Sequence, residues 1–299
     1  MVKKVGSLNS GRRSSKETGQ ITKAINELRP IYNLELLLQV AGLARSTFYY
    51  YLNKLNRAAD NSCQKRISDI YHRHKGRYGY RRITTKLKQE GYVVNHKKVL
   101  RIMREAGLKS LVRPKKYRAY KGEQGHGAKN HLNRNFYAKN PHVKWVTDIT
   151  EFNVGGKKLY FSPIMDLYNR EIVSYTFARR PNHHQVINML KKAINKLPKD
   201  ASPILHSDQG WQYKMQQYQE LLKQNDIIQS MSRKGNCLDN AVIENFFGIL
   251  KSELFYLEKF DSIITLQKAI VKYVYYYNNH RIKLKLNGLS PVDYRTQAA

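Results

Sequence analysis

The stretch WVTDITEF at residues 145–152 decides the fold. Its β-branched and aromatic side chains alternate with polar ones, a pattern that predicts a β-strand. One carboxylate, Asp148, interrupts an apolar run. Gly155-Gly156 follows and predicts a tight hairpin turn, so we expect a second apolar run at 158–167 to return beside the first strand.

The chain beyond this hairpin predicts alternating strands and helices. Strands are expected at 171–178, 203–206 and 227–231, and helices at 183–196, 213–224 and from about 239. A meander of three strands followed by alternating helix and strand is typical of a mixed sheet with helices on both faces. The fold class is therefore α/β, with a mixed five-stranded sheet flanked by helices.

Two further acids stand in distinctive surroundings. Asp208 lies in HSDQG, where a short apolar strand runs into a turn, and Glu244 lies in the helical pattern DNAVIENFF. We expect Asp148 and Asp208 at one edge of the sheet, where α/β sheets place ligands, and Glu244 on a helix across that edge. Three clustered carboxylates repel one another unless a cation lies between them. Hard oxygen ligands favour Mg²⁺, with Mn²⁺ as a substitute, and two such ions would suit a phosphodiester displacement.

These neighbourhoods carry a resemblance to a known family. HSDQG at 206–210, DNAVIENFF at 239–247 and the spacing of 35 residues between Asp208 and Glu244 resemble bacterial insertion-sequence DDE transposases of the integrase-like group. Lys251, seven positions after Glu244, matches a further mark of that group and would face the same way along the helix. The resemblance is to the product of the second reading frame and runs from about Ile25 to Arg295.

The resemblance implies a ribonuclease-H-like catalytic core in which Asp148, Asp208 and Glu244 hold two Mg²⁺ ions and no other cofactor is bound. It implies cleavage at the ends of an insertion element, followed by strand transfer into target DNA. Lys251 would hold the terminal DNA backbone. The implied partners are double-stranded DNA of the terminal inverted repeats and of the target, a second copy of the chain in at least a dimer, and the first-frame product.

The charge of the chain points to a polyanionic partner. The formal net charge is +32, and residues 1–144 contribute +25 of it, with 33 Lys and Arg against 8 Asp and Glu. Such a surface favours phosphate contacts. Two distant cysteines predict a reducing compartment, and the sequence has neither an apolar run of about 18 residues nor a signal peptide. We therefore expect a bacterial cytoplasmic protein associated with the nucleoid and not with a membrane.

The front half is expected to bind DNA through helical modules. Residues 25–55 predict a helix-turn-helix with helices over about 33–41 and 45–52, in which Arg45, Ser46 and Thr47 would open the second helix and reach DNA. The loop GRYGYRR at 76–82 combines guanidinium groups with aromatic rings, a good pairing for a phosphate backbone. The further expected DNA contacts are Arg77, Tyr78, Arg81 and Arg82 in this loop and Arg233 and Lys234 before the glutamate helix. An ordinary helical hairpin and half-buried tyrosines remain alternatives.

The predicted domains follow from these patterns. They are a disordered basic tail (1–24), a helix-turn-helix (25–60), a second helical DNA-binding module (61–110), a basic linker (111–143), the integrase-type catalytic core (144–280) and a C-terminal tail (281–299). Asp166 and Glu151 compete with Asp148 for the place in the acidic triad, but the neighbouring residues favour Asp148. Asp239 and Asn240 are expected to cap the glutamate helix.

Two other functional classes stay open on the sequence. A DNA-binding regulator with an inactive core would share the basic front half, and a nuclease acting on RNA–DNA hybrids would share the fold. The intact set of acids disfavours the first class. The helix-turn-helix pattern disfavours the second, because that motif reads duplex DNA.

Overall fold

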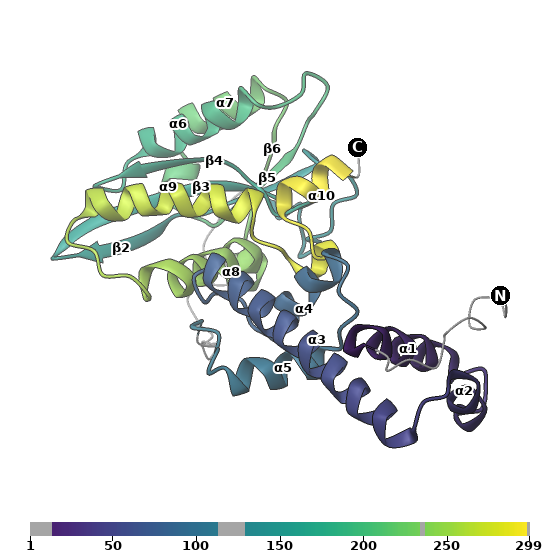
Figure 1. The fold of residues 1–299 in the computed structure, drawn as a ribbon. Coiled ribbons are helices and arrows are strands. Elements are labelled where there is room, and N and C mark those ends of the chain that lie inside the picture. The colour runs from purple at the N-terminus through teal and green to yellow at the C-terminus, as the bar shows by residue number, and fades with distance from the viewer. Residues whose placement is uncertain (1–13, 113–128, 234–236, 298–299) are drawn as a thin grey trace. The chain divides into compact units, whose positions relative to one another are not determined.

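The structure is a computed structural model that describes residues 14–112, 129–233 and 237–297 (Figure 1). It divides into two compact units. The helical unit comprises Met1–Lys75 and Leu87–Lys109, and the sheet unit comprises Gly76–Lys86 and Ser110–Ala299. The chain therefore enters the sheet unit first with a short segment, returns to the helical unit, and enters the sheet unit again after residue 109.

Helices α1 (Ser15–Leu28), α2 (Leu34–Ala41) and α3 (Arg45–Arg73) begin the helical unit. The Ser14 hydroxyl and the Glu17 carboxylate form a capping box at the start of α1, which satisfies otherwise unpaired N–H groups. The prediction of disorder through residue 24 is therefore wrong from residue 15 onward. The predicted boundary at residue 60 is also wrong, because α3 runs through it without interruption.

The two helices predicted at 33–52 are present with a turn between them, but the second, α3, continues to Arg73 and does not end near Leu52. The Asn33 side chain accepts a hydrogen bond from the backbone N–H of Glu35, and Gly42 ends α2 with φ +57°, a left-handed conformation that glycine adopts without strain. Leu38 and Phe48 from the two helices lie in one small hydrophobic core with Ile25 of α1. Two further helices follow, α4 (Tyr80–Gln89) and α5 (His96–Glu105), and the Asn95 side chain caps α5.

The six strands of the sheet are β1 (Lys144–Thr147), β2 (Thr150–Val154), β3 (Lys157–Asp166), β4 (Ile172–Ala178), β5 (Ile204–Ser207) and β6 (Ile228–Met231). The order is β2-β3-β1-β5-β6, and β4 pairs with the other edge of β3. β1 and β2 are the single strand predicted at 145–152, interrupted at Asp148-Ile149, and both pieces pair antiparallel with β3. The predicted mixed sheet is confirmed, with six strands because of this interruption.

Helices cover both faces of the sheet, as predicted. Helices α6 (His183–Ile194) and α7 (Gln216–Lys223) lie on one side, and α8 (Ala241–Leu250) and α9 (Ile263–Asn279) lie on the other (Figure 1). Side chains of consecutive strand residues point to opposite faces, so Trp145 packs with α6 and α7 while Val146 packs with α8 and α9. Two hydrophobic layers therefore fix the sheet from both sides.

The sheet unit extends beyond the predicted catalytic core at both ends. Within the predicted linker, Leu132 and Ala138 are buried in the layer that contains α8 and α9. The predicted C-terminal tail is also packed, because it contains helix α10 (Pro291–Gln297) and the buried side chain of Arg281. Residues 113–128 of the predicted linker lie outside the described residues. The predicted linker and tail are mostly polar in sequence, but each contains a few apolar residues, such as Leu132, Ala138 and Pro291, that are buried in the sheet unit.

Candidate active site

Asp148 occupies the break between β1 and β2. β1 lies between β3, with which it pairs antiparallel, and β5, with which it pairs parallel. The backbone N–H of Ile149 donates to Asp148 Oδ1 at 2.7 Å. This bond holds the carboxylate of Asp148 at the interruption through its Oδ1.

Asp208 follows the adjacent parallel strand at the same level. Val146 of β1 pairs with His206 of β5, and each acid lies two residues beyond its member of that pair. Because β1 and β5 are parallel, Asp148 and Asp208 both lie at the carboxyl ends of their strands, on the same edge of the sheet. The N–H of Gly210 donates to Asp208 Oδ1 at 2.9 Å. A Cβ at Gly210 would lie 2.5 Å from Gln212 Nε2 and 2.9 Å from the same Asp208 oxygen, so a larger residue at this position would displace the Asp208 carboxylate.

Glu244 lies in the first turn of α8, and its side chain is exposed. The start of this helix is tied to the first strand, because Asn240 Nδ2 donates to the backbone oxygen of Thr147 at 3.2 Å. The residue that accepts this bond precedes Asp148. The expected capping role of Asn240 is wrong, since its side chain makes no capping bond to α8. Asn240 instead fixes the distance between the helix of one acid and the strand of another.

The three carboxylates act on one another electrostatically. Burial first, and then the charges of Asp208 and Glu244, raise the pKa of Asp148 to about 8, against the opposing effects of the Ile149 N–H and Lys251. The partial burial of the Glu244 carboxyl, followed by the charge of Asp208, raises the pKa of Glu244, although the residue as a whole is exposed. Burial raises the pKa of Asp208, which the Gly210 N–H and Lys214 oppose. The structure thus brings the predicted triad into one region of shared negative charge.

The chemistry of this donor set fits a hard divalent cation. Asp148 and Asp208 each use Oδ1 for a backbone N–H and keep Oδ2 for another partner, and carboxylate oxygens are the ligands that such ions prefer. Within residues 14–112, 129–233 and 237–297, no three His, Cys, Asp or Glu side chains are already gathered as a metal-binding group. The exposed Glu244 side chain is the member of the triad with freedom to adjust.

Lys251 begins a π-helical turn, η4 (Lys251–Phe255), that continues α8 directly. Its ammonium group lies 5.4 Å from the centre of the Phe152 ring of β2, and its charge lowers the pKa of Asp148. The Lys251 charge therefore acts on the first acid of the triad, and that Lys251 faces the same way as Glu244 stays a prediction. A π-turn inserts an extra residue into a helix and is frequent at functional sites.

Asp239 is a residue whose role the sequence reasoning missed. Its carboxylate is fully buried, and it accepts from Arg233 Nε at 3.0 Å, Arg134 Nε at 2.8 Å and Asn130 Nδ2 at 3.0 Å. Despite the opposing effect of burial, these bonds hold the pKa of Asp239 below its ordinary value. These bonds hold the predicted DNA contact Arg233 near the start of α8, although its side chain remains exposed. The second predicted contact, Lys234, lies outside the described residues.

The competing acids have structural partners. The Asp166 carboxylate accepts from the N–H groups of His142 and Tyr168 and from the indole of Trp145, and Glu151 pairs with Lys158 at the surface. His206 is buried between two serine hydroxyls, and burial lowers its pKa to about 4, so it is neutral near pH 7. None of these three side chains therefore replaces a member of the acidic triad.

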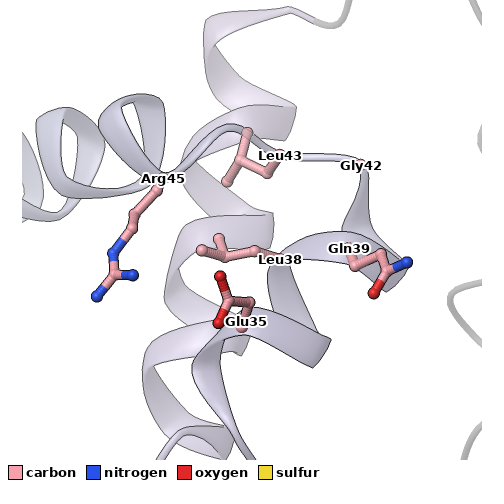
Figure 2. A pocket seen from close by; sticks show the side chains of 6 residues that line it. All are labelled: Glu35, Leu38, Gln39, Gly42, Leu43 and Arg45. Carbon is pink, nitrogen blue, oxygen red and sulfur yellow. The ribbon is translucent and has the colours of Figure 1, made fainter.

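The expected DNA contacts of the front half fall into two groups. Arg45 and Ser46 are exposed and Thr47 is half-buried at the start of α3, and a pocket beside them is lined by residues of α2 and α3, including Glu35, Leu38 and Arg45 (Figure 2). Arg81 is also exposed.

Arg77 and Tyr78 differ from the prediction, because both side chains are buried among residues of the sheet unit. Arg82 is half-buried and faces Glu253 at 3.6 Å. In the part of the chain that the structure describes, no helix is long and apolar enough to span a membrane.

Models of known protein families match three segments of this chain. Two models described as an integrase core domain match residues 138–237 and 244–298, and a model described as an HTH-like domain matches residues 59–116. The first integrase match contains Asp148 and Asp208, and the second begins at Glu244. The HTH-like match covers the second predicted helical module and not the pattern at 33–52.

Several proteins are similar over most of the chain. The putative transposase InsK for insertion sequence element IS150 of Escherichia coli is 54% identical over 92% of this chain and 98% of its own length. An uncharacterized transposase-like protein of Haemophilus influenzae is 54% identical over 72% of this chain and 99% of its own length. Transposase InsF for insertion sequence IS3A of E. coli is 30% identical over 89% and 95% of the two chains.

Two solved structures illustrate the structural likeness. The integrase catalytic core domain of HTLV-2 in complex with magnesium is 19% identical, with a TM-score of 0.42 over 52% of this chain and 98% of that one. A simian T-cell lymphotropic virus intasome in complex with the PP2A regulatory subunit B56 gamma is 18% identical, with a TM-score of 0.43 over 73% and 70% of the chains.

Proposed function

Because the chain belongs to the insertion-sequence transposases that carry an integrase core domain, we propose that it cleaves DNA at the ends of its element and transfers the freed strand by divalent-metal-dependent transesterification. Asp148, Asp208 and Glu244 are the proposed catalytic and metal-binding residues. The observation that carries this proposal is geometric: Asp148 and Asp208 follow neighbouring parallel strands at the same edge of the sheet, and the helix of Glu244 is tied to the first of these strands. The electrostatic effect of Asp208 and Glu244 on the pKa of Asp148 agrees with this placement. A cation offsets the negative charge of such carboxylates.

The proposed site holds two Mg²⁺ ions, which Mn²⁺ can replace. When bound, these ions polarise the phosphodiester and activate the attacking oxygen. Asp148 and Asp208 are held by backbone N–H groups before binding, so their free oxygens are already oriented. Glu244 completes the ligand set from α8, which the bond from Asn240 to the Thr147 carbonyl keeps near β1. Fixed ligands lower the reorganisation needed during the reaction.

Positively charged residues beside the acids would hold the DNA strand. The charge of Lys251 acts on Asp148, and Lys251 would bind the backbone at the end of the element. Arg233 presents its guanidinium from a fixed position, because Asp239 holds its Nε. Charge-assisted contacts of this kind position a phosphate backbone without reading its sequence. Lys234 would act with Arg233.

The remaining proposed contacts lie in the helical part of the chain. Arg45, Ser46 and Thr47 begin α3, which places them where a recognition helix meets base edges, and Arg81 offers an exposed guanidinium. The proposed substrates are the terminal inverted repeats and the target duplex. Transposition must bring two DNA ends together, so the proposed working form is at least a dimer, with the first-frame product as a further partner.

The experiment is a strand-transfer assay on labelled element ends in Mg²⁺. The Asp208→Asn variant keeps the shape of the side chain and removes its charge, so we expect at least a hundredfold loss of both cleavage and joining. Asp226→Asn is the matched control, because Asp226 is exposed on the turn before β6. Retained joining by Asp208→Asn would refute the mechanism. DNA binding without any cleavage by the wild-type chain would favour a regulatory role.

A further inference from the structure

Residues Gly76–Lys86, here called the strap, belong to the sheet unit although the sequence on both sides belongs to the helical unit. The strap lies before both segments matched by the integrase core models. Its charged and aromatic side chains resemble a DNA-contacting loop in composition. In the structure, two of them are buried against the end of α9 and the turn η4, so their surroundings decide what they do.

Arg77 is 6% exposed, and its guanidinium is enclosed by the sheet unit. Its Nε donates to the backbone oxygen of Glu253 at 2.9 Å. The group lies over the rings of Tyr273 and Tyr276, at 5.4 and 5.0 Å from their centres. Stacking on two rings while bonding a carbonyl of η4 uses both the face and the edge of the guanidinium. Little of this side chain is left for a phosphate.

Tyr78 is fully buried and bridges a reversal of the chain after α9. Its hydroxyl donates to the backbone oxygen of His280 at 3.2 Å and accepts from the backbone N–H of Ile282 at 3.0 Å. Between these two residues lies Arg281, so the hydroxyl clamps the backbone on either side of it. A buried hydroxyl with both bonds satisfied fixes the path of that backbone.

Arg281 and the strap meet at one buried carboxylate, Glu253. Arg281 donates to it through Nε at 2.9 Å and through a terminal nitrogen at 2.6 Å, and the Tyr273 hydroxyl donates at 3.0 Å. Arg82 of the strap lies 3.6 Å from the same carboxylate. The bidentate geometry is specific as well as strong. Glu253 is thus held by bonds from α9, from the reversal after it and from the strap.

Glu253 stands two residues after Lys251 and nine after Glu244, on one continuous helical segment. Within the π-turn, the Lys251 side chain lies against Phe152, and the Glu253 side chain is buried with Arg281 and Tyr273. Any shift of Glu253 therefore moves the helix end that carries Lys251. A displacement of about 1 Å at a reacting group can cost about a hundredfold in rate.

We propose that Arg77, Tyr78 and Arg82 are positioning residues of the catalytic site, which act by fixing η4 and with it the placement of Lys251 and Glu244, and are not DNA contacts. This inference rests on the proposed function for its catalytic consequence. The structural part of the inference, that the strap fixes η4, does not depend on the proposed function, because it follows from the contacts of Arg77 and Arg82 with Glu253. The exposed Arg81, in the same basic loop, remains the residue of the strap that is placed to meet DNA.

The two roles predict different results for single variants of the full chain. A phosphate contact contributes about 0.9 to the slope of log affinity against log salt concentration. We expect Arg81→Gln to lower this slope by about 0.9 and to leave η4 unchanged. Arg77→Gln should leave the slope unchanged, raise amide hydrogen exchange of residues 250–256 about tenfold, and lower the single-turnover cleavage rate at saturating DNA about tenfold or more.

Tyr78→Phe is a smaller change than Arg77→Gln, because it removes only the hydroxyl that bonds to His280 and Ile282 and keeps the ring. We expect it to raise exchange at residues 250–256 in the same direction. Arg295→Gln serves as the stability control, since Arg295 pairs with Glu171 at 2.8 Å elsewhere in the sheet unit, and it should leave the cleavage rate unchanged. Circular dichroism and the thermal midpoint confirm that each variant is folded.

The outcomes separate the two hypotheses. A lower salt slope for Arg77→Gln with unchanged exchange at 250–256 would overturn the positioning role. An equal loss of cleavage rate in Arg295→Gln would also overturn it, because general destabilisation would then explain the effect. The exchange measurement needs neither metal nor DNA. Failure of the proposed metal-dependent reaction, with increased exchange in both strap variants, would therefore refute the proposed function and leave the strap's hold on η4 intact.

Discussion

Binding of a divalent cation at the acidic site should release a proton from Asp148. Burial and the charges of Asp208 and Glu244 raise its pKa to about 8, so the metal-free protein holds this carboxyl protonated at neutral pH. A metal ligand must be ionised. The cation therefore displaces the proton, and its apparent affinity should fall as the pH falls below 8.

The size of the effect follows from that pKa. A group with a pKa of about 8 is about 90% protonated at pH 7 and about half protonated at pH 8. Metal binding should thus release about 0.9 proton at pH 7 and about 0.5 at pH 8, and affinity should drop about tenfold per pH unit well below 8. Without metal, the folded chain keeps a proton that the unfolded chain loses near pH 4, so stability should fall as pH rises toward 8.

Isothermal titration with Mn²⁺ in two buffers of different ionisation enthalpy measures the number of protons released. Asp148→Asn is the matched variant, since it keeps the shape and has no proton to release. The thermal midpoint of the metal-free protein between pH 5 and 8 provides a second measurement, and its decline should be smaller in Asp148→Asn. Binding of Mn²⁺ at pH 7 with no proton release would refute the assignment of the raised pKa to a metal ligand.

Three further variants test the surroundings of the site. Asn240→Ala removes the bond to β1; it should cost about 1 kcal/mol of stability in urea unfolding and slow strand transfer, and an unchanged rate would count against its positioning role. Tyr213 and Tyr218 are both fully buried, and burial raises the pKa of each, but the charges of Asp208 and Asp148 raise further only the pKa of Tyr213. Tyr213→Phe should therefore weaken Mn²⁺ binding in calorimetry, and Tyr218→Phe should not; equal effects would contradict this reading. Glu253→Gln leaves the 2% exposed Arg281 without its anionic partner, so unfolding should show a loss of about 3–5 kcal/mol, and a loss below about 1 kcal/mol would contradict a buried ion pair.

Local patterns in the sequence were sufficient to predict the catalytic fold. Alternation and the Gly155-Gly156 turn predicted the first hairpin, and both glycines have the positive φ that such a turn requires. The two carboxylates at the ends of neighbouring strands could also be placed, because β1 and β5 are short apolar runs that each stop at an acid. These features depend on neighbouring residues and on the two-residue period of a strand.

Contacts between distant segments could not be predicted in this way. Asp239 looked like a cap because it precedes a helix, yet its partners Arg134 and Asn130 lie more than a hundred residues earlier. Arg77 and Tyr78 looked like DNA contacts because a guanidinium beside an aromatic ring suits both a phosphate backbone and a buried stack. Composition does not distinguish these environments, and only the position of α9 and η4 decides between them.

The same ambiguity limits what net charge says about DNA binding. Residues 1–144 carry a balance of +25, which would suggest a steep dependence of affinity on salt. Arg77 is stacked on two rings, and Arg82 faces Glu253, an acid outside residues 1–144. Cations engaged in this way displace few counterions from DNA. The measured salt slope should therefore be set by exposed groups such as Arg45 and Arg81 and should fall well short of the formal charge.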